Sequence, residues 1–385
     1  MNAFPYLIPI LTCIYLASNG VSKFSTYFWS IVIAWALTAL MHQLFKMCRQ
    51  SSTEYLGSYV VKTEHEDAWT EIRKTKERVA VGKDRRGNTI YKEVEKIKHV
   101  HHPDEWNIFT NIDSKIMVDL DFYKEIVSTW HTPQYQRAVV GSDIVGGMRS
   151  CQYYLFGDVE KFLLKGAKNS MSAPFDDINI GKRYITITEP HTYKNKVVNS
   201  YSVFNFEKIS RQDAEIYGLF NYPALRRHDQ DCIMGRDVPA EVRIQFRLLN
   251  AILGALHQFR VFVLCFDASK GVEIAEKQRA YWYGGNKNEF VVCLGINGDG
   301  KVEWSHCFSW MDEPTLSVRA EAFFREHEDF DLMAFGKWLR ENLDLWKRKE
   351  FVEFDYLNVR LSSVQYWTWF ALTALLNILI CSIGK

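Results

Sequence analysis

The sequence lacks the short motifs by which the commonest enzyme classes are identified. It has no phosphate-binding P-loop, no G-x-G-x-x-G after a strand pattern, no G-x-S-x-G nucleophile turn, no paired C-x-x-C and no H-E-x-x-H. The nucleotide-binding, serine-hydrolase and zinc classes therefore lose their usual support. We expect no catalytic residue, no cofactor-binding residue and no cofactor, and a non-enzymatic role is favoured without an enzymatic one being excluded.

The chain also lacks net charge. Its 47 Lys and Arg oppose 46 Asp and Glu, so the formal net charge is +1 and no global field draws it onto nucleic acid. This balance excludes a dedicated DNA or RNA binder. Charged residues make up 24% and hydrophobic residues 47% of the 385 positions, and a chain of that composition and length folds into one large or two modest units.

Disulfide spacing and glycosylation sequons are absent as well. The cysteines at 151, 232, 265, 293 and 307 are scattered singly, mostly within apolar strand-like runs, and no Asn-x-Ser/Thr occurs. Both features are compatible with a reduced, non-secreted domain.

Long apolar runs are present near both ends of the chain. Residues 27–45 and 364–383 are each long enough, at 1.5 Å per residue, to cross a hydrocarbon core of about 30 Å. Residues 4–17 form a shorter run with two prolines, which fits a spanning helix, a re-entrant element or a signal sequence. We favour the first two, because no basic residue precedes the run. The sequence thus predicts an integral membrane protein with two or three transmembrane helices.

Basic residues at the flanks set the predicted orientation. Lys46 and Arg49 follow the second run and Arg360 precedes the last, whereas only Lys23 lies in the first short loop. Since Lys and Arg collect on the cytoplasmic side, the main domain should face the cytoplasm. The polar residues within the runs, His42, Gln43 and Asn377, are too few for a conduction path.

The chain between the runs divides by pattern into two domains, which follow a membrane anchor over residues 1–47 and precede the last helix at 364–383. Residues 48–237 are predicted to be β-rich, with a long hairpin that turns at Gly82 to Asn88 and strands at 182–191 and 196–210. Helical patterns lie at both ends of 121–168. Neither face of the hairpin alternates cleanly, so a solvated ribbon or one with a partner at its edge is expected.

Residues 238–357 are predicted to form an αβα layer. A helix at 241–259, a strand at 260–268, a helix at 272–282, two strands at 284–296 and 301–310 and two closing helices follow in order. The fold class is therefore an α+β membrane protein with a β-rich membrane-proximal domain and an αβα domain.

This order of elements over about residues 241–346 resembles the TPM domain. The resemblance rests on a helix, a strand, a helix ending in Trp282, a Gly-Asn-Glu stretch leading into the apolar strand Asn288 to Leu294, and its hairpin partner. It implies an αβα fold of the kind found in membrane-anchored accessory proteins. The sequence departs from the family at residues 309–314, where the family has a glycine-containing end, and so lacks support for an inherited metal or phosphatase site.

Metal candidates come from two places. His99 and His101 alternate on one strand, so their side chains share a face. In the metal-binding interpretation both bind one ion. His102, Asp104 and Glu105 follow directly. A solvated strand end explains the same run. Asp267, Asp312 and Glu313 lie at strand ends, where α/β folds place ligand sites.

Two further groups have competing explanations. One group is a loop cluster of His228, Asp229, Asp231 and Cys232. It could bind a cation or provide general acid–base catalysis; alternatively, its aspartates form ion pairs with neighbouring arginines. Residues 281–283 (Tyr-Trp-Tyr) form an aromatic recognition platform or simply anchor a helix end in the core.

The pattern as a whole favours a membrane-tethered, non-catalytic scaffold or accessory subunit with a cytoplasmic interaction domain. Its expected partners are the lipid bilayer and other protein subunits, with a homo-oligomer among the options, and no nucleic acid. The alternatives are a membrane-anchored metal-assisted hydrolase of phosphatase type and a cytoplasmic ligand sensor coupled to the membrane helices.

Overall fold

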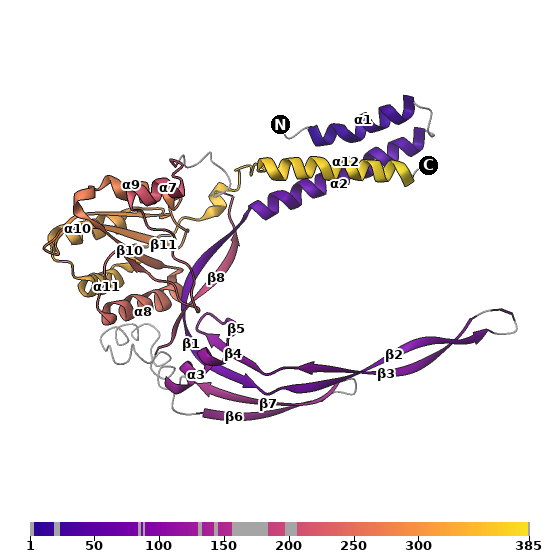
Figure 1. Cartoon of the computed structure of the whole chain (residues 1–385), viewed down its shortest axis with the longest axis horizontal. Helices are drawn as coiled ribbons and strands as arrows, with labels where there is room; N and C mark the ends of the chain where they lie inside the picture. Colours follow the sequence, from indigo (N-terminus) through magenta and orange to yellow (C-terminus); the bar gives the residue numbers. More distant parts are fainter. Residues whose placement is uncertain are drawn as a thin grey trace.

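The computed structural model is mixed α/β and contains a helical bundle, a large antiparallel sheet and a smaller mixed sheet (Figure 1). It describes residues 4–18, 24–83, 86–87, 89–129, 133–141, 145–155, 184–196 and 206–383. The mixed α/β character expected from the sequence is confirmed.

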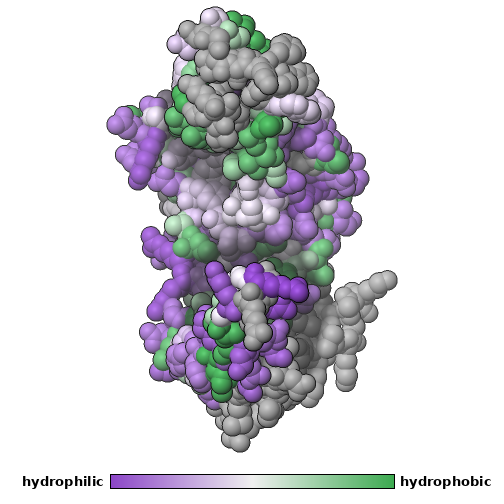
Figure 2. All heavy atoms as spheres, turned by 90° about the vertical axis from the view of Figure 1, so that its right-hand side faces the viewer, coloured by the Kyte–Doolittle hydropathy of each residue, from purple (hydrophilic) through white to green (hydrophobic). Residues whose placement is uncertain are grey.

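The bundle consists of α1 (Phe4–Ser18), α2 (Phe24–Arg49) and α12 (Ser363–Ile383), each in contact with the other two (Figure 1). Its polarity is inverted relative to a soluble bundle: Thr38, Thr373 and Asn377 are buried inside, whereas Leu11 and Trp29 are more than 60% exposed. Figure 2 shows hydrophobic residues at the top of the molecule, where the bundle lies. Exposed apolar patches of this kind are typical of surfaces that contact lipid or another protein.

One helix among the described residues is long and apolar enough to cross a membrane, over Ile31–Arg49, and 17% of its most apolar stretch is buried. Length and composition are the basis for this assignment. A signal sequence near an N-terminus has the same length and composition.

Strand β1 (Ser51–Glu66) begins two residues after α2 ends and joins the parts of the molecule. Its first half pairs with β8 (Thr186–Lys194), from Ser51 opposite Lys194 to Tyr59 opposite Thr186. Its second half pairs with β4 (Glu105–Thr110) on one side and β7 (Val145–Leu155) on the other. The large sheet is therefore built around one strand that leads directly from the bundle.

The remaining strands of this sheet lie outside that centre. β5 (Lys115–Met117) pairs with β4, and β6 (Pro133–Gly141) pairs with β7. β2 (Trp69–Lys83) and β3 (Thr89–His102) form a long hairpin at one edge. The short helix α3 (Leu120–Thr129) packs against β4.

The smaller sheet has the order β12-β11-β10-β9. β9 (Ile233–Met234), β10 (Arg260–Asp267) and β11 (Glu289–Ile296) are parallel, and β12 (Val302–Ser309) runs antiparallel to β11. Every residue of β11 is buried, because helices cover the sheet on both faces, and this explains its unbroken apolar run.

Helices α8 (Ala240–His257) and α11 (Leu332–Glu341) lie on one side of this sheet and α9 (Glu273–Tyr281) on the other (Figure 1). α10 (Thr315–Glu326) packs along β12, pairs with it through Glu321 and His306, and contacts α11 through Phe324 and Phe335. The short helix α7 (Arg211–Tyr217) and three 3-10 turns (Ala268–Lys270, Leu343–Leu345 and Phe351–Phe354) complete the described elements.

Glycines bring the two sheets together where β1 meets α8. A Cβ at Gly57 would lie 2.6 Å from the backbone carbonyl of Asn250, and a Cβ at Gly254 would lie 2.6 Å from the carbonyl oxygen of Gly57. Backbone therefore packs directly on backbone, and a side chain at either position would force the elements apart. Asn288 extends the same joint by donating a side-chain hydrogen bond to the Tyr55 carbonyl at 2.8 Å.

Two sequence expectations differ from the structure, and a third lies outside the residues that it describes. β9 pairs with β10, so the predicted boundary at residue 237 falls after the smaller sheet has begun. The predicted strand at 196–210 is not a strand at its described C-terminal end, where Ser210 instead caps α7. The second helical pattern within 121–168 lies outside the described residues.

Candidate functional site

The β2–β3 hairpin, which we call the ribbon, extends beyond the rest of the large sheet. Its strands pair from Trp69 opposite His102 to Lys83 opposite Thr89. Within the described residues only Ile72 and Arg73 of β2 also pair with β7. The ten following residues of β2, at about 3.3 Å per residue, carry the hairpin roughly 30 Å outward, and Figure 1 shows it projecting from the molecule.

Both faces of the ribbon are mixed in character. Val79 and Val94 are on one face and Tyr91 and Ile97 on the other, and all four are between 44% and 61% exposed. Charged side chains separate them along each strand, for example Lys96 paired with Glu77. The sequence expectation of a ribbon without a clean apolar face agrees with this arrangement.

The ribbon also has a free edge and a charge of its own. β3 is the last strand in the sheet order, and among the described residues no strand pairs with its outer edge. Residues 69–102 contain 10 Lys and Arg against 5 Asp and Glu, a net charge of +5, so the rest of the +1 chain sums to −4. The free edge thus belongs to the most positively charged part of the large sheet, although β3 itself contributes only three Lys against two Glu.

Four side chains fix the base of the ribbon. The His102 ring stacks on Trp69, with centroids 4.6 Å apart, and its Nε2 lies 2.9 Å from Glu71. Arg73 donates to the same carboxylate at 2.6 Å. Hydrogen bonds from Arg73 and then from His102 lower the pKa of Glu71 to about 2, so the carboxylate stays ionised and the base is held rigidly.

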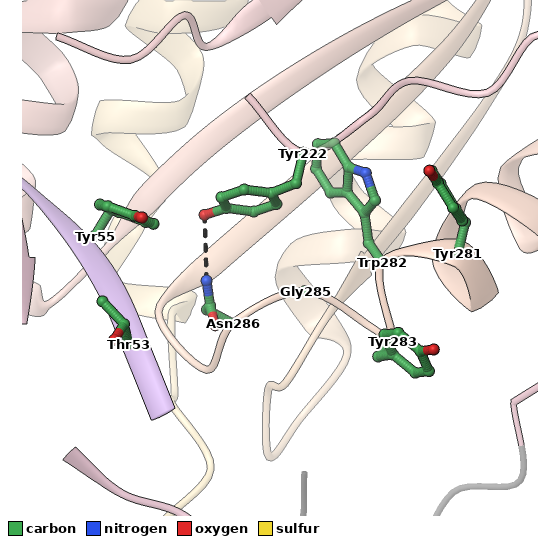
Figure 3. Close-up of a pocket in the computed structure, with 8 residues that line it drawn as sticks. All are labelled: Thr53, Tyr55, Tyr222, Tyr281, Trp282, Tyr283, Gly285 and Asn286. Carbon is green, nitrogen blue, oxygen red and sulfur yellow. Dashed lines mark hydrogen bonds between the residues drawn. The ribbon is translucent and has the colours of Figure 1, made fainter. Parts of the chain in front are cut away.

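An aromatic cleft of about 450 Å³ opens where β1 meets the smaller sheet (Figure 3). The residues that line it are mostly aromatic: Thr53, Tyr55, Tyr222, Tyr281, Trp282, Tyr283, Gly285 and Asn286. Tyr55 stacks against Tyr222, and Tyr222 meets Trp282 edge-on. The sequence singled out residues 281–283 as either a recognition platform or a helix anchor. Trp282 is buried, as an anchor would be, whereas Tyr283 is 60% exposed, so the platform stays a prediction.

A buried carboxylate lies under this cleft. Glu289 is fully buried and accepts hydrogen bonds from the Asn286 backbone at 2.7 Å, the Asn286 amide at 2.9 Å and the Tyr222 hydroxyl. Burial raises its pKa above the usual range, although these hydrogen bonds and the charge of Arg260 oppose the shift. Burial likewise raises the pKa of Tyr222. The Tyr222 hydroxyl and the Asn286 amide are 3.2 Å apart, so the polar atoms of the cleft are fixed in place (Figure 3).

Sequence reasoning missed Tyr222 and Glu289. They are 67 positions apart and neither lies in a recognisable motif. A glutamate at the start of an otherwise apolar strand was the one available signal, because a buried carboxylate needs partners.

The predicted histidine residues lie at the C-terminal end of β3, where His99 and His101 share a face of the strand. His99 and His101 are both exposed on β3, and His102 is engaged by Trp69 and Glu71. Glu105 opens β4, opposite Glu66 of β1. Among the described residues, one group gathers metal-ligand atoms within 4.8 Å of one another: His65, Asp67 and Asp104, two of which are exposed.

The strand-end carboxylates are separated by topology. Asp267 ends β10 beside Ile296, the last residue of β11, and its side chain accepts hydrogen bonds from the Ser269 backbone at 2.8 Å and from the Ser269 hydroxyl. Because β12 is antiparallel, its end lies beside the start of β11, and Asp312 and Glu313 follow there. Glu313 pairs with Lys347 at 2.9 Å. Asp267 therefore lies at the end of the sheet where β10 and β11 finish, and Asp312 and Glu313 lie at the end where β11 begins. The three carboxylates do not form one site.

Ion pairing accounts for the acids of the loop at 228–232. Asp229 pairs with Arg247 at 2.6 Å and Asp231 with Arg243 at 3.1 Å, so their arginine partners come from α8 and not from the neighbouring loop. The His228 ring stacks on Phe122. Burial raises the pKa of Cys232 to about 12, which leaves this thiol protonated and unreactive.

Polar groups within the bundle are used in packing. His42 stacks on Trp369 at 4.4 Å and its Nδ1 lies 3.1 Å from the Tyr6 hydroxyl. Trp369 donates to the Thr38 carbonyl at 3.1 Å, and Asn377 donates to the Thr373 carbonyl at 3.0 Å. The contacts of His42 and Trp369 join the three helices, whereas the Asn377 bond lies within α12.

No protein-family profile, curated protein or solved structure matches the chain.

Proposed function

We propose that this protein is a membrane-tethered, non-catalytic scaffold or accessory subunit whose ribbon binds another subunit. The observation that carries the proposal is the ribbon itself: two strands with mixed faces, a free outer edge and a net charge of +5 project from a sheet that would be complete without them. A two-stranded ribbon is marginally stable by itself in water, so an extension of this length is best explained by a binding partner.

The inverted polarity of the bundle supports the membrane tether. Apolar side chains face outward, and inside the bundle Trp369 donates a hydrogen bond between helices and Asn377 donates one within its own helix, as is favourable in lipid. Lys46 bonds to Asn358 at 3.0 Å, and Arg49 bonds to the Arg360 carbonyl at 2.7 Å. The basic ends of α2 and the segment before α12 therefore lie together, which supports a main domain on the cytoplasmic side.

The partner we propose is another protein chain that adds an extended, acidic segment to the outer edge of β3. Main-chain hydrogen bonds along a free edge provide affinity in this mode of binding. The Lys and Arg side chains of both strands favour acidic residues in the added segment and speed the encounter. A second copy of this chain is a weaker candidate, because two ribbons of charge +5 repel each other.

Shortening the ribbon tests this proposal. In the paired register Thr75 lies opposite Lys96, so residues 76–95 can be replaced by an Asn-Gly turn that closes the hairpin at this pair. The contact of Ile72 and Arg73 with β7 is kept. We expect the shortened protein to fold and to remain in membranes but to lose its co-purifying partners, measured by affinity purification in mild detergent and mass spectrometry.

A variant with Lys92→Glu and Lys98→Glu separates charge from shape, since both lysines are exposed and on one face of β3. It should weaken partner binding while the hairpin stays formed. An unchanged partner set with the shortened ribbon would refute the scaffold proposal.

The aromatic cleft favours a second candidate, the ligand sensor. Thr53 and Tyr55 of β1 line the cleft. β1 begins two residues after α2 ends, so the strand connects the cleft directly to the bundle. A small molecule bound there contacts the strand that leads to the bundle. The test is a screen of a metabolite library for a compound that binds saturably to the protein. Binding that is lost in Tyr222→Ala but kept in the protein with the shortened ribbon would favour the sensor role.

The hydrolase alternative receives no comparable support, because Asp267 lies at one end of the smaller sheet and Asp312 and Glu313 at the other. A TPM-like fold for about residues 241–346 stays a proposal, supported by a sheet with helices on both faces. The test is to compare sequences related to this chain with the TPM family. A match over these residues would support the proposed fold.

A further inference from the structure

A second cavity, of about 540 Å³, lies where the bundle meets the two sheets. Its lining comes from the end of α2, from β8, and from the segments before β11 and before α12: Gln50, Lys194, Lys196, Gln258, Lys287, Arg348, Lys349, Glu350, Val352 and Asp355. We call it the junction cavity. Five of its residues are basic and two are acidic, so its wall is positively charged.

The acidic residues at the cavity offset only part of this charge, since five basic residues line it against two acidic ones. Asp355 is paired with Lys196 at 3.0 Å. One oxygen of the buried Glu54 carboxylate lies 3.3 Å from His191 Nδ1, and the other, Oε2, has no hydrogen-bond partner. Arg348 has a guanidinium nitrogen, Nη1, that is buried without a hydrogen-bond partner. A buried unsatisfied donor of a charged group is costly, and an anion in the cavity would satisfy it.

Lys287 places a second cation beside Arg348. Its ammonium lies over the Tyr193 ring, 4.5 Å from the centroid. Burial and then the positive charge of Arg348 lower the pKa of Lys287, while the charge of Glu54 opposes this shift. Two like charges that share a poorly solvated wall repel each other, and a bound anion removes the repulsion.

The cavity lies at the level of the basic ends of the bundle. The Gln50 backbone bonds to Lys46 at 3.1 Å, which continues α2 into the cavity wall. Lys46 and Arg49 in turn bond to Asn358 and Arg360 ahead of α12. If α2 and α12 cross a bilayer, this is the depth of the lipid headgroups.

We propose that the junction cavity binds the phosphate of an anionic lipid headgroup, with the Arg348 guanidinium and the Lys287 ammonium as its principal contacts. This inference rests on the membrane tether proposed above. A planar guanidinium matches two phosphate oxygens, and an ammonium adds a point charge, so a phosphomonoester such as that of phosphatidic acid fits better than a phosphodiester.

The test uses the full chain in nanodiscs of phosphatidylcholine supplemented with phosphatidic acid or, at equal surface charge, phosphatidylserine. Retained lipids are counted by native mass spectrometry. The variant is Lys287→Gln with Arg348→Gln, and the matched control is Arg325→Gln with Lys337→Gln, two exposed cations on α10 and α11. Arg348→Lys keeps the charge and removes the planar fork.

We expect the wild type and the control to retain phosphatidic acid in preference to phosphatidylserine. The double cavity variant should lose roughly tenfold in phosphatidic acid retention, with Arg348→Lys in between. Circular dichroism of each variant establishes that the fold is kept. Equal retention by the folded cavity variant and the control would overturn the inference, and so would equal retention of the two lipids by the wild type.

Two further arms separate the sources of phosphate and the two proposals. Displacement of phosphatidic acid by millimolar inorganic phosphate, together with equally tight phosphate binding in detergent, would identify a soluble anion and overturn the lipid as ligand. Flotation with pure phosphatidylcholine vesicles tests the tether alone. Failure to float refutes the membrane tether and with it the lipid ligand, whereas flotation with loss of lipid selectivity refutes the junction site alone.

Discussion

At the scale of single residues, the absence of a side chain at Gly57 decides how the two sheets meet. We expect Gly57→Ala to destabilise the protein by about 1–3 kcal/mol, because its Cβ would lie 2.6 Å from the Asn250 carbonyl and the backbones would have to separate. Chemical denaturation followed by circular dichroism measures the change. Gly298→Ala is the control, since no atom lies within 4 Å of its Cβ, and equal losses in the two variants would contradict this explanation.

Glu71 makes the base of the ribbon sensitive to acid. Its pKa is about 2 in the folded protein against an ordinary value of 4.5, so its contribution to stability is complete above the ordinary value and is lost as pH falls toward 2. We expect Glu71→Gln to flatten the decline of the melting temperature between pH 5 and pH 2. Parallel curves for the wild type and the variant would show that the Arg73 and His102 contacts contribute nothing to acid stability.

At the scale of elements, one indole joins two helices of the bundle. Trp369→Phe keeps the aromatic ring and removes the hydrogen bond from α12 to the Thr38 carbonyl of α2, so we expect a loss of about 1 kcal/mol in detergent unfolding. Trp367 is on the same helix but is 63% exposed, and Trp367→Phe should change little. A larger effect at Trp367 would indicate that this face of α12, and not the indole contact, holds the bundle.

Elements with a strong local pattern were predictable from the sequence, and paired residues far apart in the chain were not. The helices α2 and α12, the ribbon with its turn at Gly82 and the alternation of α8, β10, α9 and β11 follow from apolar periodicity and turn residues. The hydrogen bond from Tyr222 to Glu289 and the separation of Asp267 from Asp312 depend on which strands pair and in which direction. Local pattern carries no information about either.

At the scale of the whole molecule, the proposed orientation can be measured at the tip of the ribbon. Arg86 is exposed there, and Arg86→Cys in a Cys48→Ser background adds a reactive thiol far from the bundle. We expect no labelling by a membrane-impermeant maleimide in intact cells and labelling after permeabilisation, with Cys48→Ser alone as the background. Labelling in intact cells would place the ribbon outside.

The division of β1 between two partners has a consequence for synthesis. Its second half finds β4 within about 50 residues, but Tyr59 pairs with Thr186 and Ser51 with Lys194, 127 and 143 positions later. At a ribosomal rate of roughly 5–20 residues per second, the first half of β1 waits several seconds, tethered next to α2, with both edges unpaired. The nascent chain is most vulnerable to misassembly in this interval. A chaperone acting on this protein would therefore be needed before residue 194 emerges, and much less once β8 has paired.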